Sequence, residues 1–137
     1  MSPEQNLQVG LKGTAQVEVT DHNTAASYGS GLAPVYSTPD MVGLMESACA
    51  NTVQPNFPPG YSSVGTLVNI KHLAASPIGF TIRAEAELVA IEGRRLLFNV
   101  TAYDDVEKVG EGQHERFIID DAKFMGRVAQ KLAKKQS

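Results

Sequence analysis

The sequence predicts an α+β fold in which an antiparallel sheet wraps around one central helix. Three observations favour it: a strand pattern precedes a long apolar helix pattern, four strand patterns follow it, and turn signals separate them. In that layout one sheet face buries the helix, and the other face and the sheet edges remain to be covered. Dimerisation through a strand edge or a sheet face is a natural solution.

The central helix is expected over residues 38–53. Thr38 can act as its N-cap, Pro39 suits the first helical position, and Asp40 suits the positive end of the helix dipole. At about 100° per residue, one broad stripe of this helix is apolar, so the helix should be mostly buried. The stripe consists of Met41, Val42, Leu44, Met45, Ala48 and Cys49.

Glu46 lies at the edge of this stripe and is the only charged residue between Asp40 and Lys71. A carboxylate in apolar surroundings is costly unless it is hydrogen-bonded, paired or protonated. Such burial is one way in which proteins create a general base or a nucleophile near neutral pH. The other interpretation is that Glu46 faces water from a half-exposed helix.

Five stretches alternate apolar and polar residues as strands do. Glu92 and Gly93 form the turn of a hairpin, and the strands after the helix are expected to form an antiparallel meander. The first strand begins at Leu11, and the others span residues 64–73, 80–90, 94–103 and 106–119.

Two further segments each have two interpretations. Residues 21–37 form a long connection before the helix, which is either a lid or binding loop or an ordinary crossover. A last helix, capped by Asp120 or Asp121, is rich in lysine. Its basic face is either solvated or in contact with an anionic ligand such as a nucleotide phosphate.

Composition and motifs exclude several classes of function. With 137 residues, a net charge of −3 and few aromatic residues, the chain is expected to be one domain over residues 1–137 that does not bind nucleic acid. The single Cys49 excludes a disulfide framework, and no leader or membrane-span pattern is present, so we expect a cytoplasmic protein. Cys49 is either a buried thiol or a nucleophile. Phosphate-loop, dinucleotide and Gly-x-Ser-x-Gly motifs are absent, and the three histidines lack metal-ligand spacing.

Three groups could converge with Glu46: Thr38, His72, and the pair His114 and Arg116. His72 ends a strand, where it is either a structural histidine or a proton shuttle. His114 and Arg116 share a strand face with Gly110 and Gly112, and a salt-bridged outer face is the alternative to a site.

Several motifs closely resemble the fluoroacetyl-CoA thioesterase family of hot-dog-fold proteins, in order and over roughly residues 35–132. They are Thr38, Met41 to Cys49, Gly65-Thr66, Lys71 to Gly79, Glu92 to Leu96 and Gly112 to Arg116. The resemblance implies a helix wrapped by an antiparallel sheet, a homodimer, and hydrolysis of a small acyl-CoA thioester. Coenzyme A enters as part of the substrate, and neither a cofactor nor a metal is implied.

The resemblance also implies a catalytic constellation of Thr38, Glu46 and His72, with a backbone contact at Gly65 and Arg116 near the acyl group. The family lid carries a phenylalanine, whereas residues 31–36 of this chain place Leu32 there. We expect Leu32 or Tyr36 to line the acyl pocket.

Thr38 and Glu46 cannot hydrogen-bond within one straight helix, because eight residues span about 12 Å along its axis. Either the helix starts later and Thr38 folds back, or the site is shared between subunits. Two alternatives to a thioesterase remain: a non-catalytic protein that binds acyl-CoA in the same groove, and, less favoured, a hydratase on the same fold.

Overall fold

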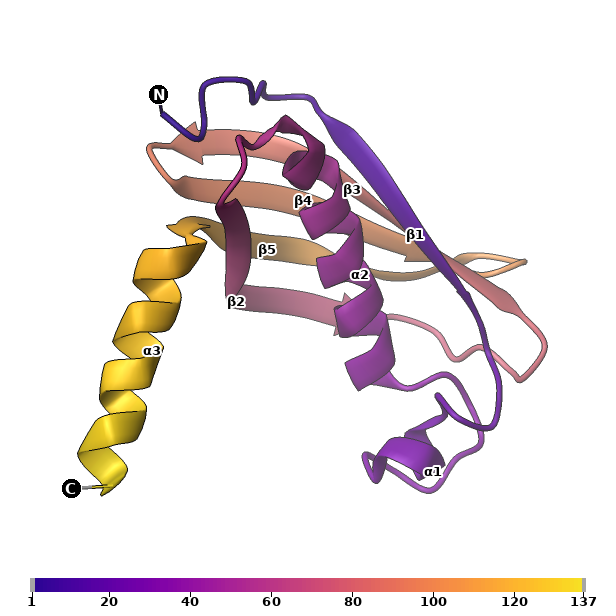
Figure 1. The fold of residues 1–137 in the computed structure, drawn as a ribbon. Helices are drawn as coiled ribbons and strands as arrows, with labels where there is room; N and C mark the ends of the chain where they lie inside the picture. The colour runs from indigo at the N-terminus through magenta and orange to yellow at the C-terminus, as the bar shows by residue number, and fades with distance from the viewer. Residues whose placement is uncertain (1, 137) are drawn as a thin grey trace.

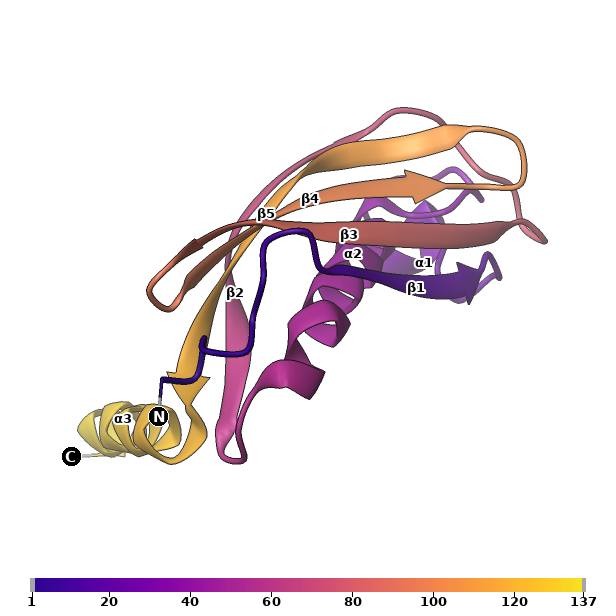
Figure 2. The same ribbon diagram turned by 90° about the horizontal axis from the view of Figure 1, so that it is seen from above.

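The computed structural model describes residues 2–136, which form a curled five-stranded antiparallel sheet with the long helix α2 against its concave face (Figures 1 and 2). The predicted arrangement of sheet and helix is therefore confirmed. In chain order the elements are β1 (Lys12–Glu18), α1 (Ala25–Tyr28), α2 (Thr38–Val53), the 3-10 turn η1 (Gln54–Asn56), β2 (Tyr61–His72), β3 (Thr81–Glu92), β4 (Arg95–Tyr103), β5 (Lys108–Asp120) and α3 (Asp121–Gln136).

The strand order is β1-β3-β4-β5-β2, so the predicted meander is correct only for β3, β4 and β5. Strand β2 pairs with β5 at the far edge instead of with β3. The chain places α2 between β1 and β2, and the sheet curls around this helix with the two strands at its opposite edges (Figure 2). Because β2 is an edge strand, one side of its backbone is unpaired in the single chain.

The N-terminus of α2 differs by one residue from the prediction. Ser37 is the N-cap, since its hydroxyl accepts a hydrogen bond from the Asp40 N–H at 3.2 Å. Thr38 is thus the first helical residue, and Pro39 is the second rather than the first. The hydroxyl of Thr38 is therefore not needed for capping and is available for another partner.

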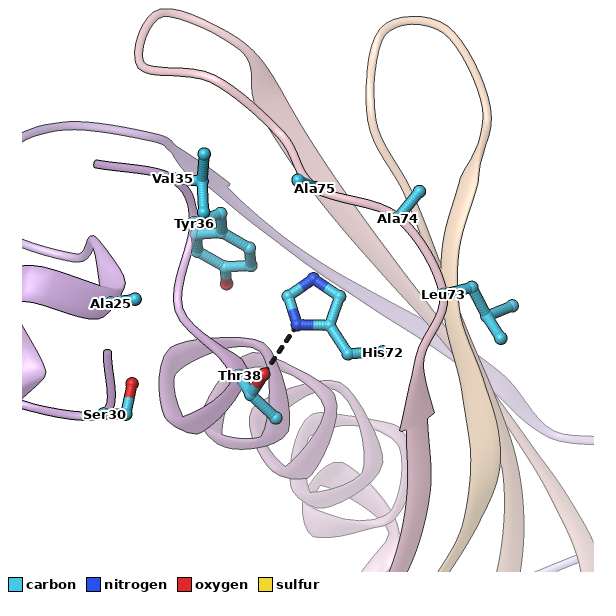
Figure 3. A pocket seen from close by; sticks show the side chains of 9 residues that line it. All are labelled: Ala25, Ser30, Val35, Tyr36, Thr38, His72, Leu73, Ala74 and Ala75. Atoms are coloured by element: carbon cyan, nitrogen blue, oxygen red, sulfur yellow. Dashed lines mark hydrogen bonds between the residues drawn. The ribbon is translucent and has the colours of Figure 1, made fainter. Parts of the chain in front are cut away.

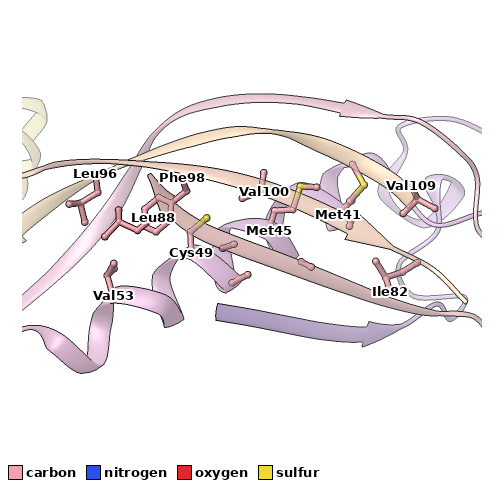
Figure 4. Close-up of a cluster of buried hydrophobic side chains, with 14 of the residues drawn as sticks. Met41, Met45, Cys49, Val53, Ile82, Leu88, Leu96, Phe98, Val100 and Val109 are labelled. Carbon is pink, nitrogen blue, oxygen red and sulfur yellow. The ribbon is translucent and has the colours of Figure 1, made fainter. Parts of the chain in front are cut away.

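The core lies between α2 and the concave face of the sheet (Figure 4). Met41, Met45 and Cys49 have no exposed surface, which confirms the predicted apolar face of the helix. Gly110 lets α2 approach β5, because a Cβ at this position would lie 2.6 Å from the sulfur of Met41. Helix α2 packs mainly on β1 and β3, which leaves β2 alongside its other flank.

Helix α3 follows β5 directly and projects away from the sheet (Figure 1). Asp120 accepts a hydrogen bond from the Lys123 N–H at 3.2 Å, as expected for one of the two predicted caps. The apolar residues Met125, Val128 and Leu132 are all more than two-fifths exposed. Within residues 2–136, none of the helices combines the length and the apolar character that a membrane span requires.

Candidate active site

Thr38 and His72 form a close pair where the start of α2 meets the end of β2. The Thr38 hydroxyl oxygen lies 2.7 Å from Nδ1 of His72. Thr38 stands in the first turn of the helix, and His72 is the last residue of β2. This hydrogen bond therefore fixes the imidazole relative to the N-terminus of α2.

The second ring nitrogen of His72, Nε2, is buried and has no hydrogen-bond partner among the described residues. In Figure 3 it points away from Thr38. Burial lowers the pKa of His72, against a smaller opposing effect of the Ala74 backbone. The imidazole is thus neutral at pH 7, with Nδ1 bonded to Thr38 and Nε2 without a hydrogen-bond partner among the described residues.

A pocket of about 360 Å³ adjoins this pair (Figure 3). Tyr36 lines the pocket and is only 1% exposed, and its ring lies edge-on to His72 with 6.5 Å between the ring centroids. Burial, with the nearby Asp40 carboxylate, raises the pKa of Tyr36, so its phenol stays protonated. The lining residues are Ala25, Ser30, Val35, Tyr36, Thr38, His72, Leu73, Ala74 and Ala75.

Leu32, the other residue expected at the acyl pocket, does not lie at this pocket in the single chain. Its side chain is 96% exposed, and the pocket wall from residues 21–37 is formed by Ala25, Ser30, Val35 and Tyr36 instead. A role for Leu32 in binding the acyl group remains a prediction.

Glu46 lies further along α2, in polar rather than apolar surroundings. Its side chain is 38% exposed, and its Oε2 is 3.9 Å from Nη1 of Arg116. Gly65 on β2 is also adjacent, because a Cβ there would lie only 2.9 Å from Oε2. The expectation of a carboxylate in apolar packing is therefore wrong. Glu46 is instead a half-exposed carboxylate beside a cation and a strand backbone.

His114 and Arg116 on β5 lie on the inner face of the sheet, with exposures of 0% and 8%. The alternative of a salt-bridged outer face is therefore wrong for this pair. Arg116 donates from Nε to the Ser63 hydroxyl, from Nη2 to the Ser63 carbonyl, and from Nη1 to Nε2 of His114, at 2.8, 2.8 and 3.1 Å. Ser63, which the sequence analysis did not single out, thus holds the guanidinium with two contacts.

The candidate residues therefore form two separate groups in the single chain. Thr38 and His72 meet at the start of α2, whereas Glu46, Gly65 and Arg116 meet two helical turns later. Helix α2 begins at Thr38, so the alternative in which the helix starts later is wrong. The spacing of Thr38 and Glu46 puts about 12 Å of helix between them.

Cys49 does not belong to either group of site residues. It is fully buried, and burial raises its pKa to about 12, against an opposing effect of Arg116. A thiol with so high a pKa is a poor nucleophile at neutral pH. Cys49 is therefore a core residue.

Comparison with known proteins identifies the family. Residues 19–122 match the family described as FlK, fluoroacetyl-CoA-specific thioesterase. The fluoroacetyl-CoA thioesterase of Streptantibioticus cattleyicolor is 46% identical over 97 residues, which cover 71% of this chain and 70% of that protein.

Solved structures agree with this match. A structure of the fluoroacetyl-CoA thioesterase FlK has a TM-score of 0.85 at 40% identity, covering 91% of this chain and 97% of that one. A thioesterase superfamily member from Thermus thermophilus has a TM-score of 0.87 at 28% identity, covering 96% and 97%. A hot-dog-like protein from Thermanaerovibrio acidaminovorans, at 21% identity and a TM-score of 0.86, shares the fold. The resemblance inferred from the motifs is thus confirmed, and the chain belongs to the fluoroacetyl-CoA-specific thioesterase family of hot-dog-fold thioester hydrolases.

Proposed function

We propose that this protein hydrolyses a small acyl-CoA thioester to the free acid and coenzyme A, and that it does so as a homodimer. The observation that carries the proposal is the hydrogen bond between Thr38 and His72 at the mouth of a 360 Å³ pocket, in a member of a thioesterase family. A pocket of that size suits a short acyl group together with part of its carrier.

The separation of the two groups of site residues supports a site shared between subunits. The stretch Gly65–Asn69 of the edge strand β2 is exposed in the single chain. Antiparallel pairing of this stretch with a second copy brings the Gly65 end of one β2 to the His72 end of the other. Glu46 of one protomer then faces the partner's Thr38 and the partner's His72, which stay hydrogen-bonded to each other, and each dimer holds two such sites.

The chemistry follows from these positions. Glu46 acts on the thioester carbonyl, either as the base that takes a proton from the attacking water or as the nucleophile itself. The developing oxyanion is stabilised by a backbone N–H near Gly65, and Arg116 lies beside the acyl group. The attacking water loses a proton to Glu46, and His72, neutral at the start, relays a proton from this side of the site to the sulfur, which leaves as thiolate when the C–S bond breaks, so that the products are the acid and the free thiol. Thr38 orients the imidazole and the water.

Release of free thiol from acetyl-, fluoroacetyl-, propionyl-, malonyl- and benzoyl-CoA tests the proposal. We expect turnover of at least one short acyl thioester, and a loss of about 100-fold or more in kcat for Glu46→Gln, because that amide neither accepts a proton nor attacks carbonyl carbon. Binding of these thioesters without turnover would instead indicate a non-catalytic acyl-CoA-binding protein. Full activity of Glu46→Gln would remove the carboxylate from the mechanism.

A further inference from the structure

We infer that His114 is a positioning residue that aims the Arg116 guanidinium at the acyl site and fixes the β2 backbone beside Gly65. The inference rests on the proposed function of the site that contains Glu46, Gly65 and Arg116. His114 itself does not contact the substrate in this account. It acts through two neighbours, each held by one ring nitrogen.

The two hydrogen bonds of His114 determine its protonation state. Nδ1 lies 2.8 Å from the carbonyl oxygen of Leu67, which can only accept, so Nδ1 carries a proton. Nε2 lies 3.1 Å from Nη1 of Arg116, which can only donate, so Nε2 carries a lone pair. The imidazole is therefore neutral and has the proton on Nδ1. Burial, together with the charge of Arg116, lowers its pKa and keeps it neutral.

The bond to Arg116 completes the fixation of the guanidinium. Ser63 accepts two of its five N–H groups and His114 accepts a third, which leaves two N–H groups, one on each terminal nitrogen. Nη1, which His114 holds, is also the nitrogen 3.9 Å from Glu46. Without an acceptor at His114, this nitrogen can turn toward the Glu46 carboxylate and close that gap.

The bond to Leu67 fixes an irregular part of β2. The pairing of β2 with β5 shifts register between Gly65 and Leu67, which makes Thr66 an extra residue in the strand. A bulge of this kind redirects the backbone next to it. The Leu67 carbonyl, held by the buried ring of His114, anchors one side of the bulge, and Gly65 forms the other side. A Cβ on Gly65 would lie 3.0 Å from Cε1 of His114, so ring and backbone are in close contact.

One test is independent of catalysis. Nitrogen-15 NMR of the histidine side chains in the wild-type protein at pH 7.5 reports which ring nitrogen carries the proton. We expect a neutral His114 with Nδ1 protonated, and this signal should change in Arg116→Ala. A doubly protonated ring, or one with the proton on Nε2, would overturn the inference even if no substrate is turned over.

The kinetic test compares His114→Phe and His114→Gln with Val100→Ala, a buried change on β4 that only weakens packing. We expect His114→Phe to lower kcat by about 100-fold with little change in KM, because misplacement of a reacting group by about 1 Å has that effect. His114→Gln, whose amide oxygen can accept from Arg116, should recover part of this loss. Val100→Ala should keep the wild-type kcat.

Double variants separate failure of this inference from failure of the proposed function. If His114 acts through the acyl site, adding His114→Phe to Glu46→Gln should cause no further loss in kcat. A wild-type kcat in folded His114→Phe, or a loss that Val100→Ala reproduces, would overturn the positioning role. Full activity of Glu46→Gln would contradict the proposed function instead, and the NMR result would still decide the state of His114.

Discussion

The hydroxyl oxygen of Thr38 lies 2.7 Å from Nδ1 of His72, which joins the first turn of α2 to the last residue of β2. The local sequence makes this contact available, because Ser37 rather than Thr38 caps the helix. A threonine hydroxyl released from capping can orient a neutral imidazole whose other nitrogen has no hydrogen-bond partner within the described part of the chain. This contact is the basis of the first prediction.

Thr38→Val removes the hydroxyl while keeping the shape of the side chain. We expect kcat to fall by about 10- to 100-fold, since His72 loses the group that orients it, while Thr38→Ser retains most of the activity. Stability should change by only about 1 kcal/mol, the usual net value of one hydrogen bond. Thr14→Val, on the exposed face of β1, is the matched control. Thioester hydrolysis at the wild-type rate by Thr38→Val would show that the contact is not used.

Gly65→Ala should impair activity more than folding. The added Cβ would lie 2.9 Å from Oε2 of Glu46 and 3.0 Å from Cε1 of His114. Glu46 is half-exposed and can swing away, so we expect a kcat loss of about 10-fold or more with a melting temperature close to that of the wild type. Gly126→Ala in α3 is the control, because within residues 2–136 no atom beyond its chain neighbours and the local backbone of its own helix lies within 4 Å of its Cβ position. A Gly65→Ala protein with normal kcat would place the acyl site elsewhere.

His72 and His114 make stability depend on pH. The pKa values of His72 and His114 are both lowered by burial. Below about pH 6.5 the unfolded chain binds protons that the folded chain excludes, so the free energy of unfolding should fall as pH drops from about 6.5 toward the folded pKa values. Well above a pH of about 6.5, these two histidines should not make the free energy of unfolding depend on pH.

Urea unfolding at pH 7.5, 6.5 and 5.5, at one fixed protein concentration, measures this slope. His114→Gln should have a shallower slope than the wild type, because the buried titrating group is gone. Equal slopes in the wild type and His114→Gln would contradict the assignment.

Leu32→Ala tests whether the exposed loop contributes to the acyl pocket. Leu32 is 96% exposed in the single chain, so its truncation should leave stability within about 0.5 kcal/mol. If Leu32 closes over a bound acyl group, the ratio of kcat/KM values for longer and shorter acyl-CoA substrates should rise in the variant. Val106→Ala, an exposed change in the β4–β5 turn, is the control. An unchanged ratio would assign selectivity to the pocket wall around Tyr36.

Periodicity was sufficient to predict the five strands and the helices α2 and α3, but not the short helix α1 inside the connection of residues 21–37. The apolar stripe of α2 and the alternation in β3 and β4 report directly which face is buried. Strand order was not predictable in the same way. The alternation of residues in β2 is compatible with pairing to β3 or to β5. Its position beside β5 depends on how the sheet closes around the helix.

The candidate site was predictable in its members but not in their surroundings. Side chains alternate along a strand, so the spacing of two residues placed His114 and Arg116 on one face of the sheet. The structure shows that this is the inner face. The contact of Ser63 with Arg116 depends on the register of β2 and β5, which a single sequence does not encode in a readable pattern. The apolar environment expected for Glu46 was wrong because Arg116 and the Gly65 backbone reach it from the sheet.

The central claim is that each active site combines Glu46 of one protomer with the partner's Thr38 and the partner's His72. The most direct test mixes two impaired proteins, Thr38→Val and Glu46→Gln, and lets their subunits exchange. A mixed dimer would then contain one intact site, so equal amounts should recover about one quarter of the wild-type activity per protomer, since half of the dimers are mixed. If the mixture stays as inactive as its components although mass spectrometry shows mixed dimers, the two groups of residues do not form a site between subunits.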